Sequence, residues 1–162
     1  MGASIFDCVA QFAEATVQGG LETTASDRQV SGGVALPGIF HHPQGEDWAR
    51  LSYEVELSPL SEGERVVLLF AVGIRDGARL DDPAAPFDGV TCAVEVNGRR
   101  LLEAAVHGPG WRWYSLDLSR FGGRKVVLTF AVHGNDNTNY DWFFVGAASP
   151  LSVDPDRRGG AA

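Results

Sequence analysis

Hydrophobic and polar residues alternate along much of this chain, which is the pattern of half-buried β-strands. Residues 51–57 place Leu, Tyr, Val and Leu at every second position, with Ser and Glu between them. Residues 90–96 repeat the pattern, and Asn97-Gly98 follows directly. That pair tolerates the positive φ angles of a type I′ turn. The sequence therefore predicts a β-hairpin made of residues 90–96 and 99–106.

Two seven-residue stretches, 66–72 and 126–132, are apolar on both faces and are predicted to be central strands. They consist of nearly the same residues, either because of an internal duplication or because two buried strands converged on one pattern. Neither origin changes the expected fold. Further strands are expected at residues 29–36, 111–118 and 140–147, separated by turns rich in Gly, Pro, Asn and Asp.

The amino-terminal segment has a helical rather than a strand-like period. Apolar residues stand at positions 5, 6, 9, 12 and 13, and Ser4 and Asp7 occupy the positions of a capping box. A short helix over about residues 4–13 is predicted. The whole pattern indicates an all-β fold over residues 1–153: a jelly-roll β-sandwich of two antiparallel sheets with this helix. Residues 154–162 are expected to be a disordered tail, because they offer little to bury.

Composition and charge exclude several classes of partner. The chain has 13 Lys and Arg residues against 21 Asp and Glu residues, a net charge of −8, which argues against nucleic acid and anionic membrane surfaces. No apolar run is long enough to span a membrane, and the first residues lack the basic-then-apolar start of a secretory signal. Cys8 and Cys92 fit either a buried thiol pair or one disulfide, so they do not identify the compartment.

The order of several short motifs resembles a known group of β-sandwiches. The segments are Asp-Gly-Val-Thr at 88–91, Val-Glu-Val-Asn-Gly at 94–98, Leu-Asp-Leu-Ser at 116–119 with Phe-Gly-Gly-Arg after it, and Asn-Thr-Asn-Tyr-Asp-Trp at 137–142. Over about residues 45–148 the chain resembles the galactose-binding-like domains, and among them a group described as novel carbohydrate-binding modules. Cys92 stands where such modules usually have an aromatic residue. The resemblance implies a jelly roll, usually non-catalytic, that is associated with extracytoplasmic carbohydrate-active proteins.

Three tryptophans are the candidate ligand-binding residues. Trp111 and Trp113 lie at i and i+2 of a predicted strand, so both share the outer face with Asp117 while aliphatic residues take the inner face. Exposed indoles beside polar groups suit the C–H face of a sugar ring. The alternative is that the helix or a loop covers one or both indoles. Trp48 either joins this surface or closes one end of the sandwich.

The segment 134–141 combines amides and carboxylates, the ligand types that calcium prefers. Asp88, Asp136, Asn139 and Asp141 are the candidate calcium ligands, and no other cofactor is expected. The alternative is a long polar turn whose side chains bond their own backbone. In that interpretation Asp141 is a structural acceptor for backbone N–H groups of the Asp88 loop.

The sequence contains none of the common catalytic motifs, so we expect no enzyme activity. The adjacent pair His41-His42 is a weak metal candidate, because neighbours on an extended chain point to opposite sides. The first functional hypothesis is a non-catalytic module that binds a glycan or a cell-surface polysaccharide. The second is a structural subunit that docks on itself or on a larger protein through the helix at 4–13 and the apolar segment 34–40.

Overall fold

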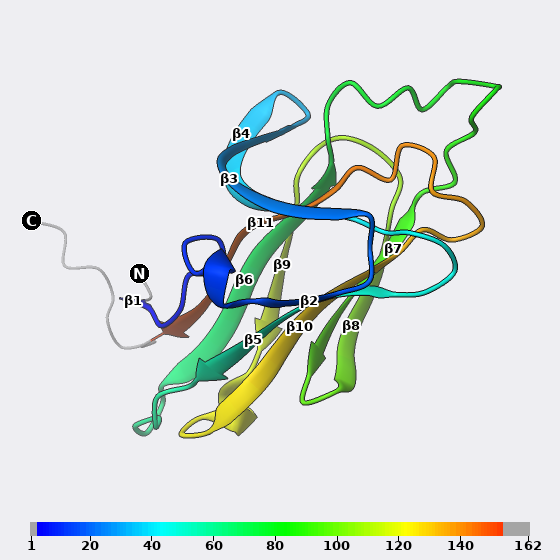
Figure 1. The fold of residues 1–162 in the computed structure, drawn as a ribbon. Coiled ribbons are helices and arrows are strands. Elements are labelled where there is room, and N and C mark those ends of the chain that lie inside the picture. The colour runs from blue at the N-terminus through cyan, green and yellow to red at the C-terminus, as the bar shows by residue number, and fades with distance from the viewer. Residues whose placement is uncertain (1–2, 154–162) are drawn as a thin grey trace, which may run out of the picture.

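Eleven strands form two antiparallel sheets in the computed structural model, which describes residues 3–153 (Figure 1). The predicted tail at 154–162 lies outside the described residues. One sheet, called sheet A, runs β3-β4-β11-β6-β9, with β1 also paired to β11; the other, sheet B, runs β2-β5-β10-β7-β8. Sheet A contains β1 (Ala3–Ser4), β3 (Glu22–Ser31), β4 (Val34–His42), β6 (Arg65–Ile74), β9 (Arg112–Asp117) and β11 (Phe143–Val153). Sheet B contains β2 (Thr16–Gln18), β5 (Ala49–Glu56), β7 (Val90–Val96), β8 (Arg99–Val106) and β10 (Lys125–His133).

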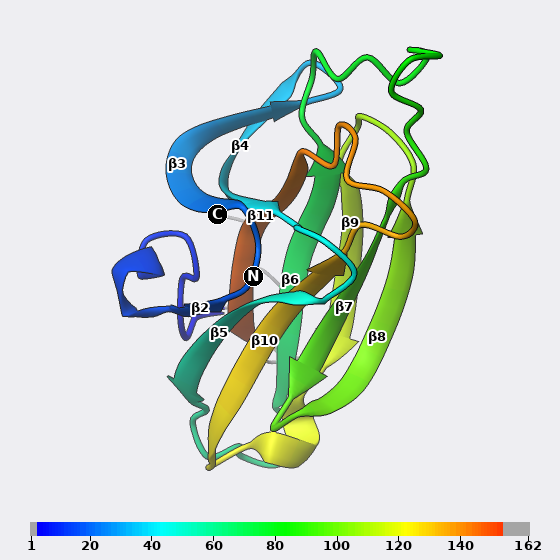
Figure 2. The same ribbon diagram turned by 45° about the vertical axis from the view of Figure 1, so that its right-hand side comes forward.

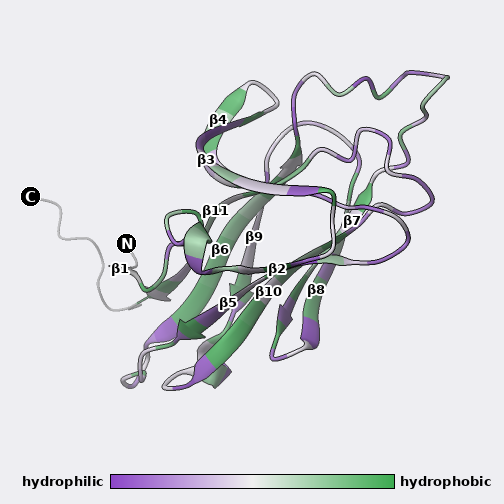
Figure 3. Cartoon of the chain, in the orientation of Figure 1, coloured by the Kyte–Doolittle hydropathy of each residue, from purple (hydrophilic) through white to green (hydrophobic). Residues whose placement is uncertain are grey.

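The core lies between the sheets and is built from the inward residues of each strand. Tyr53, Phe70, Leu128 and Phe143 are among its largest side chains, and each is almost completely buried. The predicted central strands are confirmed: β6 lies between β11 and β9, and β10 lies between β5 and β7. Both are hydrophobic along most of their length (Figure 3). The sequence thus predicted a β-sandwich correctly.

The hairpin predicted at Asn97-Gly98 is confirmed. β7 and β8 pair antiparallel with Val96 opposite Arg99, and Asn97 and Gly98 have φ angles of 52° and 77°. Two consecutive positive φ angles are those of a type I′ turn, whose twist matches that of the flanking strands.

The predicted amino-terminal helix is wrong. Its only helical part is a single 3₁₀ turn, η1 (Phe12–Glu14). The backbone N–H groups of Ile5 and Cys8 donate to the carbonyls of Pro150 and Ala148 on β11, which holds this segment against sheet A. Asp7 does cap a turn, since its carboxylate accepts from the N–H groups of Val9 and Ala10. A second 3₁₀ turn, η2 (Ser119–Phe121), follows β9, and no helix among the described residues is long and apolar enough to cross a membrane.

The single strand predicted over residues 29–36 is also wrong, because a tight turn divides it. Gly32 and Gly33, at φ angles of 60° and 76°, connect β3 to β4. The resulting hairpin is strongly bent, and Figure 2 shows β3 as a C-shaped ribbon. The strand predicted at 140–147 begins three residues later, at Phe143, and continues to Val153. Residues of both strands of this hairpin line the groove described below.

Candidate functional site

Trp111 lies across the outer face of sheet A and is largely used for packing. Its indole stacks on Phe144 with ring centroids 5.7 Å apart, and its Nε1–H donates to the carbonyl of Val34 at 2.8 Å. Gly146 leaves room for the ring, since a Cβ there would lie 2.6 Å from Trp111 Cζ3. Strands of sheet A, rather than the amino-terminal segment or a loop, thus provide the contacts of the half-buried Trp111.

Trp113 remains open to solvent on the same face. Its side chain is 51% exposed, while the neighbouring Tyr114 stacks on Phe70 in the core. Asp117 lies on the same face of β9, where its carboxylate accepts from the N–H of Ser119. That bond, together with the Ser119 side chain, lowers the pKa of Asp117. Asp117 therefore serves the turn that follows its strand.

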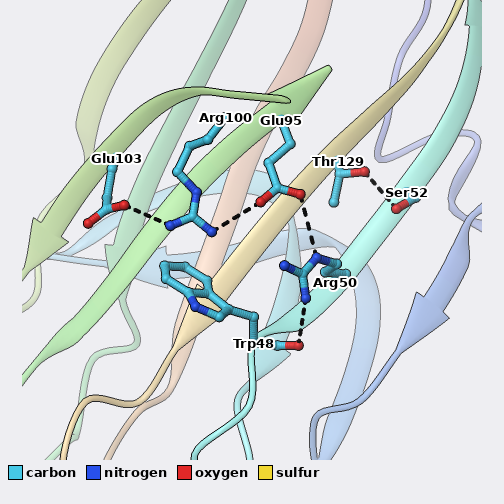
Figure 4. A network of polar contacts seen from close by, with 7 residues as sticks. All are labelled: Trp48, Arg50, Ser52, Glu95, Arg100, Glu103 and Thr129. Atoms are coloured by element: carbon cyan, nitrogen blue, oxygen red, sulfur yellow. Dashed lines mark hydrogen bonds and ion pairs between the residues drawn. The ribbon is translucent and has the colours of Figure 1, made fainter. Parts of the chain in front are cut away.

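Trp48 lies on the outer face of sheet B, on the opposite side of the sandwich from Trp111 and Trp113. The Arg100 guanidinium lies over the Trp48 ring, 4.1 Å from its centroid (Figure 4). The ring of His133 lies 5.3 Å from the Trp48 ring. Arg100 also forms ion pairs with Glu95 and Glu103, and Arg50 pairs with the second oxygen of Glu95. The four predicted ligand-binding residues are thus divided between two surfaces.

A groove with a volume of about 580 Å³ opens beside the β3–β4 hairpin, on the face of sheet A that carries Phe40 and Phe144. We call it the hairpin groove. Its lining residues come from β3, β4, the beginning of β11 and the segments next to β6 and β11. They are Leu21, Glu22, Thr24, Arg28, Gln29, Val30, Phe40, His42, Arg75, Asp76, Trp142 and Phe144.

Aromatic side chains supply much of the apolar surface of the hairpin groove. Phe144 is buried, and Phe40 packs edge-on against it with ring centroids 5.9 Å apart. Trp142 is half-buried, with Tyr140 at its edge and the Arg75 guanidinium 5.6 Å from its ring centroid. Arg28, Gln29, Glu22 and the other polar residues line the same groove.

Two local features hold the hairpin in its bent position. The Asp76 carboxylate accepts from the N–H groups of Gly32 and Gly33, at 2.6 and 2.8 Å. Ser31 is completely buried; its hydroxyl donates to the carbonyl of Ile74 and accepts from the N–H of Gly110. The tip of the hairpin is therefore tied to the end of β6 and to the loop before β9. The sequence pattern did not identify the hairpin groove, because the groove depends on contacts between segments that are far apart in the sequence.

The predicted calcium ligands lie in and around the loops that precede β7 and β11. Asp88 accepts from the N–H of Asp136 at 2.8 Å, while the Asn139 side chain donates to the carbonyl of Pro86. Asn135 further joins the two loops by donating to the Asp88 and Gly89 carbonyls. Most of these polar groups therefore satisfy one another, as in the polar-turn interpretation.

Asp141 differs from its neighbours. It is completely buried, and neither carboxylate oxygen has a hydrogen-bond partner among the described residues; Asp88 Oδ1 is likewise unpartnered. Burial, with a smaller contribution from the nearby Asp88 charge, raises the pKa of Asp141 to about 8. Asp141 is thus not the acceptor of backbone amides that the sequence suggested. An unpartnered buried carboxylate requires either a proton or a cation, and the oxygens of Asp88 and Asp141 are of the type that calcium binds.

The remaining candidates have structural surroundings. His41 is buried in the sandwich with its Nδ1 2.9 Å from the Thr23 hydroxyl, and burial lowers its pKa to about 4. His42 lies on the opposite face of the same strand, as expected for adjacent residues. Cys8 and Cys92 are both buried free thiols, so the disulfide alternative does not apply. Among residues 3–153 no group of three or more His, Cys, Asp or Glu side chains could hold a metal ion.

The comparison with known proteins finds similarity in structure but not in sequence. No protein-family model matches the chain, and no curated protein matches it. Among solved structures, TmCBM61 in complex with β-1,4-galactotriose aligns with a TM-score of 0.63 at 14% identity, covering 93% of this chain and 99% of that one. The CBM22-1 xylan-binding domain of Paenibacillus barcinonensis Xyn10C aligns with a TM-score of 0.58 at 14% identity, covering 94% and 96%.

A third structure, CBM51 from Clostridium perfringens GH95 in complex with methyl-galactose, aligns with a TM-score of 0.55 at 16% identity, covering 83% of this chain and 92% of that one. This chain has the galactose-binding-like β-sandwich fold. Some similar domains belong to longer chains: this protein spans 29% of the structure that holds the CBM51-2 and INT domains of C. perfringens ZmpB. At these identities the likeness establishes the fold alone.

Proposed function

We propose that this protein is a non-catalytic glycan-binding module and that the hairpin groove is its binding site. The observation that carries the proposal is the groove itself, an open concave surface that combines aromatic rings with hydrogen-bonding side chains. Sugar rings present an apolar C–H face and an edge of hydroxyls, so a site of this composition suits them. Carbohydrate-binding modules of the same fold, crystallised with galactose derivatives or named for xylan, support the class of ligand.

Phe40 and Trp142 are the expected stacking residues. Both line the groove while remaining partly accessible, unlike Phe144 beneath them. Gln29, Thr24 and Arg75 would supply hydrogen bonds to hydroxyl groups around the ring. Trp113 lies on the same face of sheet A but does not line the groove, so it provides a natural comparison.

The test is a binding screen on a panel of galactans, xylans and other polysaccharides, followed by titration of the best ligand. Trp142→Ala is expected to weaken binding at least tenfold, and Trp113→Ala to change it less than twofold. Near-UV circular dichroism and the melting temperature establish that each variant is folded. If Trp142→Ala does not fold, Phe40→Leu tests the same surface with a smaller change.

Two results contradict the proposal in different ways. Loss of binding in Trp113→Ala alone would move the site to the aromatic surface of β9 that the sequence predicted. Binding to no member of the panel would reject the glycan-binding function, and the self-associating subunit would then be the better hypothesis. Light scattering over a range of concentrations tests that alternative directly.

A further inference from the structure

Two arginines of the hairpin groove have no carboxylate partner. The ion pairs found among residues 3–153 engage Arg50, Arg100 and Lys125, and none includes Arg28 or Arg75. The chain carries 21 acidic against 13 basic residues, so carboxylates are plentiful. A single unpaired surface arginine is ordinary. Two that line one groove beside aromatic rings form a specific combination.

A β-bulge directs Arg28 into the groove. The pairing of β3 with β4 shifts between Ser26 and Gln29, so Asp27 and Arg28 have no partners in the register. Arg28 lines the hairpin groove, whereas Asp27 lines a separate, smaller depression beside Asp7 and Pro37. Bulges commonly re-aim a side chain in this way. The bulge therefore separates the two opposite charges and leaves the guanidinium alone in the groove.

Arg75 is positioned from the other side of the groove. Its backbone N–H donates to the carbonyl of Trp142 at 2.8 Å, and its guanidinium lies near the Trp142 ring. Asp76 follows directly, and its N–H donates to the carbonyl of Val30, two residues beyond Arg28. These backbone contacts bring the segments that carry Arg28 and Arg75 to the same end of the groove, near the hairpin tip.

The acidic residues of the groove offset the charge of this end only in part. Asp76 keeps its charge, but both of its oxygens accept from the N–H groups of Gly32 and Gly33. It forms no ion pair with Arg28 or Arg75, so this end carries two guanidinium groups against one carboxylate. Glu22 lies at the beginning of β3, opposite His42 in the strand register and therefore at the far end of the hairpin from its tip. The groove thus has an arginine-rich end next to its aromatic surface.

We propose that the hairpin groove binds an acidic sugar, a hexuronic or sialic acid residue, whose carboxylate lies between Arg28 and Arg75 while its ring packs against Phe40 or Trp142. This inference rests on the glycan-binding function proposed above and names its ligand class. A guanidinium binds a carboxylate through two parallel N–H···O bonds, which are stronger than bonds to neutral hydroxyls. A neutral sugar has no negative charge with which either guanidinium could form an ion pair.

The test compares matched acidic and neutral saccharides by isothermal titration calorimetry with the full chain. The pairs are tetragalacturonic acid and its methyl ester, glucuronosyl-xylotriose and xylotriose, and sialyllactose and lactose. In at least one pair we expect the acidic member to bind about tenfold more tightly in 50 mM salt, and the difference to shrink at 500 mM salt. Arg28→Gln and Arg75→Gln are expected to remove most of the preference.

Arg99→Gln is the matched control, because Arg99 is an exposed residue on β8 of sheet B and its substitution changes the net charge equally. Arg28→Gln is the safer of the two test variants, since Arg28 is exposed and lies in a bulge. A preference that survives in both groove variants, or that Arg99→Gln also removes, would overturn the inference. Equal binding of both members of every pair would do the same. Neutral saccharides that bind in a Trp142-dependent way would then leave the glycan-binding function standing, whereas binding of no saccharide would reject both.

Discussion

Trp111, directly before β9, donates its indole N–H to the carbonyl oxygen of Val34, 2.8 Å away, and thereby joins the start of β9 to β4 across the outer face of sheet A. β6 and β11 lie between these two segments, and Gly146 of β11 lies under the indole. The bond holds the beginning of β4, which belongs to the hairpin that shapes the groove. A tryptophan that the sequence predicts to bind ligand thus also supports one wall of the hairpin groove.

Trp111→Phe tests this supporting role. Phenylalanine can keep the stacking on Phe144 but loses the hydrogen bond to Val34, so the free energy of unfolding should fall by about 1 kcal/mol. Trp113→Phe is the control, since Trp113 is exposed on the same strand, and its change should stay within about 0.5 kcal/mol. Chemical denaturation measures both. Equal effects in the two variants would show that the hydrogen bond does not stabilise the hairpin.

Gly146→Ala should disturb the packing of the Trp111 indole on β11. The added Cβ would lie 2.6 Å from Trp111 Cζ3, so the indole must move, and we expect a cost of roughly 1–3 kcal/mol in the free energy of unfolding. Gly108→Ala is the matched control, because its Cβ would meet only Leu80 Cδ1 at 3.5 Å, an ordinary contact. Thermal denaturation distinguishes the two. A Gly146 variant as stable as the Gly108 variant would mean that Trp111 does not pack on β11 as described.

The strands could be predicted from the sequence because their signals are local. Alternation over residues 51–57 and the Asn97-Gly98 turn depend only on neighbouring residues, and both appear in the structure. The amino-terminal helix was predicted from equally local spacing, but hydrogen bonds from Ile5 and Cys8 to β11 determine that segment. Likewise, the Gly32-Gly33 turn inside the predicted strand 29–36 is stabilised by Asp76, more than 40 residues away in the sequence.

Gly98→Val tests the hairpin turn that the sequence predicted. Gly98 has a φ angle of 77°, a conformation that a β-branched residue adopts only with strain, so stability should fall by about 1 kcal/mol or more. Gly98→Asn should cost less, because asparagine tolerates the left-handed region better. Melting temperatures of the two variants provide the measurement. No difference between Val and Asn would indicate that the turn adapts without the positive φ.

The candidate site was less predictable than the strands. Exposed tryptophans at i and i+2 are a local signal, but whether an indole is free depends on which strands it meets, as Trp111 and Trp48 illustrate. Phe40, Arg75 and Trp142 are far apart in the sequence, and they line one groove because β4 and β6 both flank β11 in sheet A. The apolar run that begins at Trp142 was a weak signal, since it is equally typical of a buried strand.

The last prediction concerns the buried carboxyl group of Asp141 and its effect on stability. Its pKa is about 8 in the folded protein, against an ordinary value of 3.8, so the folded state retains a proton that the unfolded chain releases. The contribution of protonated Asp141 to the free energy of unfolding is therefore fully present below about pH 4 and is lost as the pH rises toward 8. Asp141→Asn removes this ionisation. In chelator-containing buffer the variant should melt at a higher temperature than the wild type at pH 8, and the difference should shrink or reverse at pH 4.

Adding calcium at pH 8 tests whether a bound cation or a bound proton compensates for the buried Asp141 carboxylate. The ionised Asp141 carboxylate would lie near the unpartnered Oδ1 of Asp88, and a cation that binds only the folded state would remove the cost of that charge by mass action. A rise in the wild-type melting temperature that is absent in Asp141→Asn would assign a calcium site to Asp88 and Asp141. An unchanged melting temperature, combined with the pH dependence above, would assign the role to the proton. If the Asn variant is instead less stable at every pH in chelator, Asp141 makes a stabilising contact as a carboxylate, and the pKa argument is wrong.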